Sequence, residues 1–118
     1  MQNLKKLSNL IKLSSNVRIL IPSTLKIDKA IDNTLQVDKA LTFFSNLFGG
    51  ATSFKALGAW QSPTAGLVKE NVVAVESFCD SQTLEESIDQ VLTFCENLKQ
   101  EMEQDAISLF VNNELYFI

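Results

Sequence analysis

Histidine is absent from this sequence, which removes the commonest general base near neutral pH and the usual transition-metal ligand. Ser-His-Asp catalysis, Cys-His catalysis and imidazole-based metal centres are therefore excluded. The two cysteines, Cys79 and Cys95, are too few for a disulfide framework and lack the spacing of zinc motifs. We expect two reduced thiols, no metal and no cofactor.

Long apolar runs are also missing, because no stretch approaches the roughly 18 residues that a membrane span needs. Residues 1–22 combine lysines with leucines, but polar residues interrupt the leucines and no small-residue cleavage site follows, unlike a secretory signal. A chain of 118 residues matches one domain with a buried core. The expected location is the cytoplasm.

Positive charge is scarce in the second half of the chain. Residues 1–60 carry eight basic and three acidic side chains, whereas residues 61–118 carry two basic and eleven acidic ones. An acidic surface repels a phosphate backbone, and the RNP1 pattern is missing, so nucleic acid is not an expected partner. The acids of one predicted helix indicate either a solvated face or a protein partner with a basic surface, bound through Glu85, Glu86 and Asp89.

Hydrophobic spacing predicts the helices. Leucines three and four residues apart predict an amphipathic helix over 3–14. A longer apolar stripe predicts a first core helix, capped by Asn33 or Thr34 and ended by Gly49-Gly50. A second core helix follows Ser81, with Thr83-x-x-Glu86 as a capping box.

Apolar runs bounded by turn residues predict the strands. The run 17–22 ends at a proline, and the runs 51–60 and 67–78 are joined by QSPTAG as a hairpin. Strands 106–111 and 114–118 flank Asn112-Asn113, a pair that supplies the positive φ values of a tight turn.

This order of elements is the split βαβ pattern of ferredoxin-like folds. We predict an α+β domain over 17–118, with an antiparallel sheet of order 2-3-1-4, two helices on one face and a C-terminal β-hairpin extension. Residues 1–16 form an N-terminal amphipathic helix or arm. The central strands are apolar on both faces, so the second face should also be covered. We expect a homodimer with the N-terminal helix contributing; the alternative is a monomer closed by helix 3–14 alone.

The segment Gly49–Trp60 holds three of the four glycines and the only tryptophan. Its strand half is the leading binding surface, where an aromatic side chain offers contact area and a lysine offers charge. The structural alternative is a helix stop at the glycine pair, close strand packing at Gly58 and a core-filling Trp60. The residues of this surface are Phe54, Lys55, Gly58 and Trp60.

Two carboxylates, Glu70 and Glu76, lie six residues apart on one predicted strand and therefore on one face. Each is a candidate acid or base. The favoured interpretation is an ion pair across strands with Arg18 or Lys55.

Four motifs, VRILIPST, LFGGAT followed by GAW, LVKENVVAVESF and NNELYFI, give the chain a wider resemblance. Over residues 17–118 it resembles short, largely uncharacterised proteins of bacterial phages, prophages and plasmids. The resemblance implies a compact α+β fold and a mobile-element setting in a bacterial host. It supplies no catalytic residues.

Three functions are compatible with these features, and the sequence leans away from an enzyme. The first is a non-enzymatic inhibitor of a host defence system, anti-CRISPR-like or other, acting through protein contacts. The second is a homo-oligomeric protein that binds or sequesters a small molecule or nucleotide, in an interface pocket lined by Arg18, Phe54, Lys55 and Trp60. The third is a small enzyme that uses Glu70 or Glu76.

Overall fold

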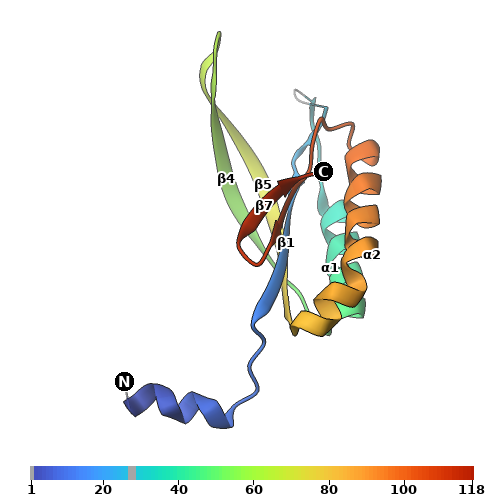
Figure 1. The fold of residues 1–118 in the computed structure, drawn as a ribbon. Coiled ribbons are helices and arrows are strands. Elements are labelled where there is room, and N and C mark those ends of the chain that lie inside the picture. Colours follow the sequence, from blue (N-terminus) through green and yellow to red (C-terminus); the bar gives the residue numbers. More distant parts are fainter. Residues whose placement is uncertain (1, 27–28) are drawn as a thin grey trace.

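The computed structural model describes residues 2–26 and 29–118 and has two layers, a five-stranded antiparallel sheet and two helices on one of its faces (Figure 1). The strand order is β4-β5-β1-β6-β7, which contains the predicted order 2-3-1-4. The predicted α+β fold is confirmed. The elements of these layers are β1 (Ser15–Pro22), α1 (Thr34–Phe48), β4 (Thr52–Ser62), β5 (Gly66–Cys79), α2 (Ser81–Glu101), β6 (Ser108–Val111) and β7 (Glu114–Phe117).

The core lies between the sheet and the two helices. Alternate residues of β1 point toward the helices, so Val17, Ile19 and Ile21 are fully buried there. Phe44 of α1 and Val91 of α2 meet them from the helix layer, also fully buried. This packing leaves the other set of β1 side chains on a face of the sheet that neither helix covers.

The ends of both helices follow local chemistry. Gly49 has φ 92° and donates its backbone N–H to Ser45, so the predicted stop of α1 is confirmed. The predicted capping box of α2 is wrong, because the helix begins at Ser81 and Asp80 is its N-cap. The Asp80 carboxylate accepts the backbone N–H of Thr83 at 2.7 Å, which satisfies a donor of the first turn.

The start of α1 differs from the prediction in a similar way. Asn33 occupies the N-cap position but makes no side-chain cap bond, and its amide donates instead to the carbonyl of Pro22 at 2.9 Å. The carboxylate of Asp32 accepts the backbone N–H of Thr34 at 3.0 Å. The segment between β1 and α1 contains a small two-stranded sheet, formed by β2 (Thr24–Leu25) and β3 (Lys29–Ala30).

Two hairpins shape the sheet. Asn112 and Asn113 both have positive φ, 51° and 67°, as the predicted β6–β7 turn requires. The β4–β5 hairpin is longer than the sheet, since β1 pairs with β5 only from Val72 to Cys79. The remainder of β4 and β5 extends beyond the other strands as a two-stranded ribbon (Figure 1).

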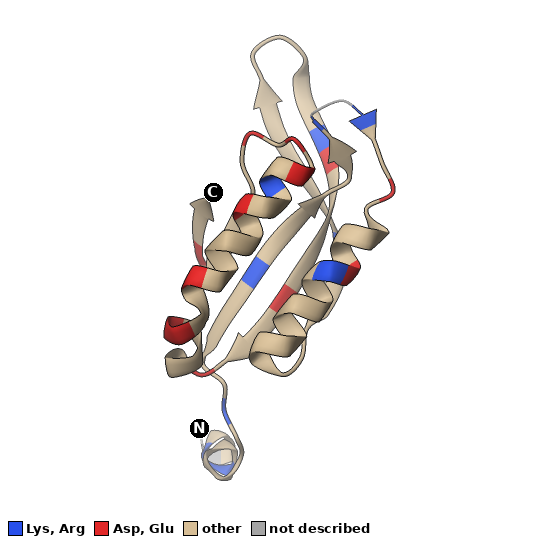
Figure 2. Cartoon of the chain, turned by 90° about the vertical axis from the view of Figure 1, so that its right-hand side faces the viewer, with Lys and Arg blue, Asp and Glu red and all other residues tan. Residues whose placement is uncertain are grey.

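The N-terminal segment is a 3-10 helix, η1 (Gln2–Asn9), rather than the predicted amphipathic helix over 3–14. It lies beyond one end of the sheet and covers neither face (Figures 1 and 2). The alternative of a monomer whose sheet is closed by helix 3–14 alone is therefore wrong. Within the described residues, no helix has the length and apolar character needed to cross a membrane.

Candidate functional site

An ion pair lies at the centre of the sheet face that the helices leave uncovered, here called the open face. Arg18 of β1 stands directly opposite Glu76 of β5. The Nε of Arg18 donates to Oε2 of Glu76 at 3.0 Å, and an Nη of the same guanidinium donates to the same oxygen. The predicted pairing of Arg18 with a strand carboxylate is thus observed.

Two aromatic rings frame the guanidinium of Arg18. Its Cζ lies 5.7 Å from the centroid of the Phe54 ring and 5.6 Å from that of Phe110. Both distances fall within the range of cation–π attraction. Strand register explains the arrangement, because Phe110 is directly opposite Arg18, while Phe54 is opposite Ala74, a small residue.

The Glu76 carboxylate is held on one side only. Its side chain is 14% exposed and that of Arg18 is 32% exposed, so the pair is partly shielded from water. Both guanidinium bonds end on Oε2. Among the described residues no donor reaches Oε1, which is left to receive a proton or a donor from a ligand.

A hollow of about 480 Å³ opens beside Glu76, at the end of the sheet where α1 turns into β4. Ser77 fixes the glycine turn there, because its Oγ donates to the carbonyl of Gly50 at 2.6 Å. Glu76 thus lies between the framed guanidinium and the hollow. The lining residues are Leu13, Phe48, Gly49, Gly50, Ala51, Thr52, Glu76, Ser77 and Phe78.

The hollow holds one carboxylate among apolar side chains, backbone groups and the hydroxyls of Thr52 and Ser77. Within the described residues, no three His, Cys, Asp or Glu side chains gather as a metal site would require. The nearby thiol of Cys79 is buried, and its burial, together with the charge of Asp80, raises its pKa. Burial raises the pKa of the Cys95 thiol to about 12. Neither thiol is activated as a nucleophile.

The structure brings together only part of the predicted binding surface. Phe54 and Arg18 are neighbours, as the interface-pocket hypothesis required. Gly58 and Trp60 share their face but lie farther along β4, toward the protruding ribbon. Trp60 is 49% exposed, so the core-filling interpretation is wrong. A Cβ on Gly58 would make an ordinary 3.6 Å contact with the Glu70 carbonyl, so close packing does not require glycine there.

Lys55 does not belong to the predicted pocket. It stands opposite Val73, whose side chain faces the helix layer, so Lys55 projects to the opposite side of β4 from Phe54. Glu70 shares the open face with Glu76, but six residues of strand separate them by about 20 Å. The two carboxylates therefore cannot act on the same reacting group.

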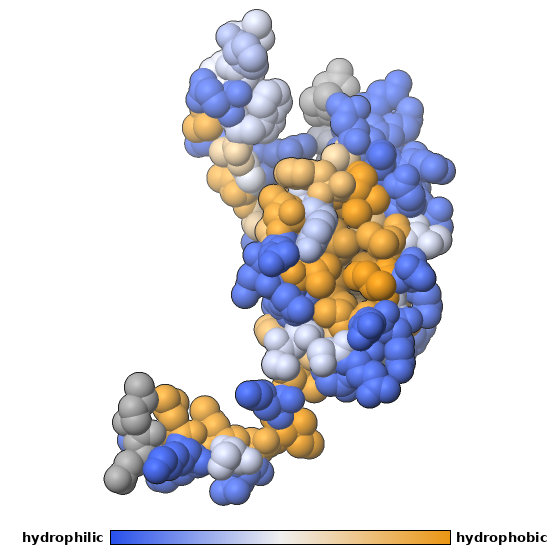
Figure 3. All heavy atoms as spheres, in the orientation of Figure 1, coloured by the Kyte–Doolittle hydropathy of each residue, from blue (hydrophilic) through white to orange (hydrophobic). Residues whose placement is uncertain are grey.

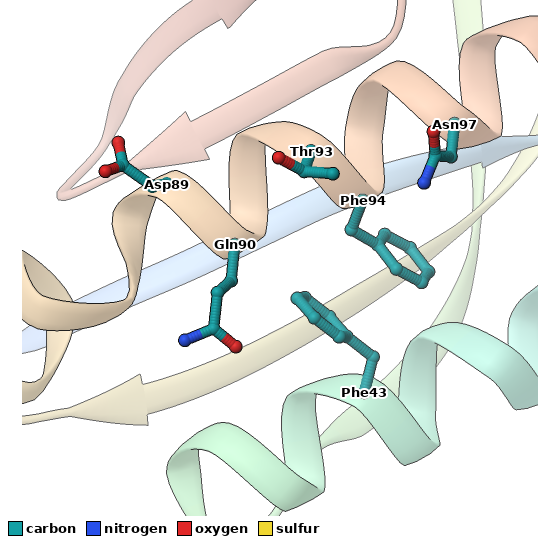
Figure 4. Close-up of a pocket in the computed structure, with 6 residues that line it drawn as sticks. All are labelled: Phe43, Asp89, Gln90, Thr93, Phe94 and Asn97. Atoms are coloured by element: carbon teal, nitrogen blue, oxygen red, sulfur yellow. The ribbon is translucent and has the colours of Figure 1, made fainter.

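The acidic residues of α2 lie in the other layer of the molecule. Glu85, Glu86 and Asp89 are exposed on that helix, which faces the viewer in Figure 2. Asp89 borders a hollow of about 390 Å³ between α2 and α1. Phe43 and Phe94 stack there, with ring centroids 4.4 Å apart (Figure 4). This acidic surface and the Arg18–Glu76 pair are two separate regions.

Sequence reasoning missed Phe110 and the role of the glycine turn. The alternation of the final strands carried a usable signal for Phe110, since its buried neighbour Leu109 faces the core and Phe110 must face the other way. From the sequence, the glycine pair is predicted mainly to end the first core helix. The hollow beside Glu76 depends on strand register, which local sequence patterns do not specify.

Comparison with solved structures gives the architecture a precedent. The chain is similar to a phage SAM lyase in complex with S-methyl-5′-thioadenosine, with a TM-score of 0.67, 18% identity and coverage of 92% of both chains. It is also similar to a phage SAM lyase in the apo state, with a TM-score of 0.62, 20% identity and coverage of 92% of this chain and 94% of the other. No protein-family model and no curated protein matches the chain.

These similarities overturn the leading sequence-based hypothesis. A non-enzymatic inhibitor acting through protein contacts is contradicted, since the similar structures are those of an enzyme that binds a small molecule. Absence of histidine had favoured the inhibitor.

Proposed function

We propose that this chain is a SAM-cleaving enzyme whose active site is the open face around Arg18 and Glu76. The supporting observation is the combination of a shared fold, over 92% of both chains, with a hollow that places one partly shielded carboxylate beside aromatic side chains. An S-adenosyl compound carries a sulfonium and an ammonium cation, a carboxylate and a flat adenine ring. The open face offers a carboxylate for the ammonium group and an aromatic side chain for the adenine ring.

Glu76 is the proposed contact for the amino-acid portion of the substrate. Its Oε1 is available to accept a hydrogen bond from the substrate ammonium group, and charge-assisted bonds of this kind are among the strong ones. The Arg18 guanidinium, held by Phe54 and Phe110, positions the carboxylate. Phe78, which is 52% exposed at the hollow, provides an apolar surface for the adenine ring.

The reaction breaks the bond between the sulfonium sulfur and Cγ of the methionine portion. The bonding electrons pass to sulfur, which becomes the neutral thioether of S-methyl-5′-thioadenosine. The four-carbon fragment completes its valence in one of two ways: its own carboxylate oxygen bonds to Cγ, or a proton leaves Cβ for a base. Only the second route asks Glu76 to accept that proton, and neither route requires histidine.

The mobile-element setting and the cytoplasmic location inside a bacterial host fit this proposal. The similar structures are phage proteins, and a mobile-element setting for this chain would be the same as theirs. Cleavage of SAM would deprive host enzymes that use SAM, including defence enzymes that methylate DNA. Anti-defence activity would then follow from consumption of a metabolite.

We also propose that a second copy completes the site, as in the predicted homodimer. The open face exposes large apolar side chains, and the ribbon formed by β4 and β5 has no third strand beneath Trp60. Isolated two-stranded ribbons are marginally stable in water. The exposed apolar side chains on this face are Phe54, Trp60, Phe78, Leu115 and Phe117.

Ligand-induced stabilisation tests the proposed binding chemistry. At a hundredfold its dissociation constant, a ligand adds about 2.7 kcal/mol to the free energy of unfolding. We expect S-methyl-5′-thioadenosine to raise Tm by several degrees in differential scanning fluorimetry. Glu76→Gln should leave that rise largely unchanged, because the thioadenosine lacks the ammonium group that Glu76 would bind. An equal rise with ATP would indicate a general nucleotide-binding protein. No rise with SAM or the thioadenosine would contradict the proposed site.

A further inference from the structure

The N-terminal segment has an apolar ridge that the other described residues leave exposed. Leu4 and Leu7 in η1 and Leu10 just after it are 58%, 56% and 64% exposed. A spacing of three residues places side chains in line along a 3-10 helix. The same segment carries Lys5, Lys6 and Lys12. Residues 2–13, here called the arm, therefore form a basic amphipathic element that extends from the body (Figures 1 and 3).

A matching apolar groove lies between α2 and the β6–β7 hairpin. It has a volume of about 320 Å³ and appears in Figure 3 as a hydrophobic area bordered by hydrophilic residues. Leu92 of α2 is 38% exposed and Tyr116 of β7 is 47% exposed, so this apolar surface is open to solvent. The lining residues are Ile88, Leu92, Leu109, Val111, Tyr116 and Ile118.

The border of this groove is acidic. Glu85 precedes Ile88 by three residues and Glu96 follows Leu92 by four, so both acids lie on the helix face that lines the groove. On the other side, exposed Glu114 of β7 accepts the Tyr116 hydroxyl at 2.9 Å. Negative charge around an apolar groove complements an apolar ridge flanked by lysines.

The arm cannot readily reach the groove of its own chain. Leu13 lines the hollow beside Glu76 and Phe78, at the end of the sheet where α1 turns into β4. Only two residues separate Leu13 from Leu10, which allows about 10 Å of extended chain between them. The groove lies on the helix side, and η1 lies beyond the end of the sheet in both ribbon views (Figures 1 and 2).

From the complementary shape, polarity and charge, we infer that the arm of one chain docks in the α2–β7 groove of a second copy. The leucine ridge fills the groove, and Lys5 and Lys6 face Glu85 and Glu96. In this arrangement the acidic side of α2 binds a basic surface, which is the arm of a second copy of the chain. The inference does not depend on SAM cleavage.

Cross-linking of full-length chains tests this docking directly. A Leu7→Cys chain mixed with a Leu92→Cys chain should form a covalent dimer under mild oxidation, since the buried native thiols stay unreactive. The matched control pairs Leu7→Cys with Leu57→Cys, a position on the ribbon that is more exposed than Leu92 and therefore at least as accessible to a thiol. Equal yields from both pairs, or a link formed only when both cysteines are in one chain, would overturn the inference.

Solution mass provides the second measurement. Leu7→Gln/Leu10→Gln should lower the mass measured by light scattering, whereas Asn3→Gln/Asn9→Gln should leave it unchanged. Lys5→Glu/Lys6→Glu should weaken association at least tenfold, and adding Glu85→Lys/Glu96→Lys in the same chain should restore most of it. A wild-type monomer at all concentrations, or no effect of the leucine substitutions, would refute arm docking.

Discussion

Arg18 and Glu76 face each other across β1 and β5, with the guanidinium bonded to a single carboxylate oxygen and framed by Phe54 and Phe110. The arrangement holds the carboxylate in one orientation without occupying its second oxygen. Positioning of this kind is what a binding site for a cationic substrate requires.

Glu76→Gln should lower the rate of S-methyl-5′-thioadenosine formation by a factor of about 100 or more, the range for a lost acid–base or charge contact. The amide has nearly the same shape, so circular dichroism should show an unchanged fold. Glu70→Gln is the matched control, because that carboxylate lies on the same face but about 20 Å away. Equal loss in the two variants would mean that neither residue has a special role.

The product from the four-carbon fragment separates the two routes for Glu76. A lactone identified by mass spectrometry would indicate closure by the substrate carboxylate, and Glu76→Gln should then raise KM more than it lowers kcat. An unsaturated amino acid would indicate proton removal from Cβ. In that case Glu76→Gln should lower kcat more than it raises KM.

Phe110→Leu should weaken SAM binding about twofold to fivefold, because it removes one of the rings that hold Arg18. A cation–π contact at a partly exposed site contributes about 0.5–1 kcal/mol, and titration calorimetry resolves that difference in binding. Phe117→Leu is the control, since this ring is 71% exposed on the same face, in β7. A larger effect from the control would contradict the role of Phe110.

Much of the fold follows from local sequence, and the reasons are identifiable. Helical spacing and the glycine stop locate α1, and Asn112-Asn113 sets the β6–β7 turn. The open face was anticipated in part, because apolar residues on both sides of the central strands predicted a second covered face. What local patterns lack is register, which decides that Arg18 meets Glu76 and that Lys55 points away.

The start of α2 gives a pH-dependent prediction. Hydrogen bonds from Thr83 hold the pKa of Asp80 below its usual value. Because the folded-state pKa is lowered, Asp80 contributes stability above the unfolded pKa, and this contribution is lost as pH falls through the folded pKa. Asp80→Asn keeps an acceptor, so its urea-unfolding free energy should vary less with pH below about 4. If the unfolding free energy of Asp80→Asn fell as steeply with decreasing pH as that of the wild type, the proposed contribution of the Asp80 cap would be contradicted.

The alkaline limit of stability depends on Cys95. Burial raises its pKa to about 12, so the folded state retains a proton that the unfolded chain releases above its own pKa, near 9. This contribution is therefore lost progressively from about pH 9 toward pH 12. In Cys95→Ala the unfolding free energy should fall less steeply over that range. Rapid alkylation of native Cys95 at pH 8 would show instead that the thiol is accessible.

The most direct measurement is chromatography of SAM incubated with the purified full-length protein. The account predicts time-dependent conversion to S-methyl-5′-thioadenosine, proportional to protein concentration and nearly abolished by Glu76→Gln. Unchanged SAM at protein concentrations where ligand binding is saturated would contradict the central claim. That result would indicate a protein that binds SAM without cleaving it.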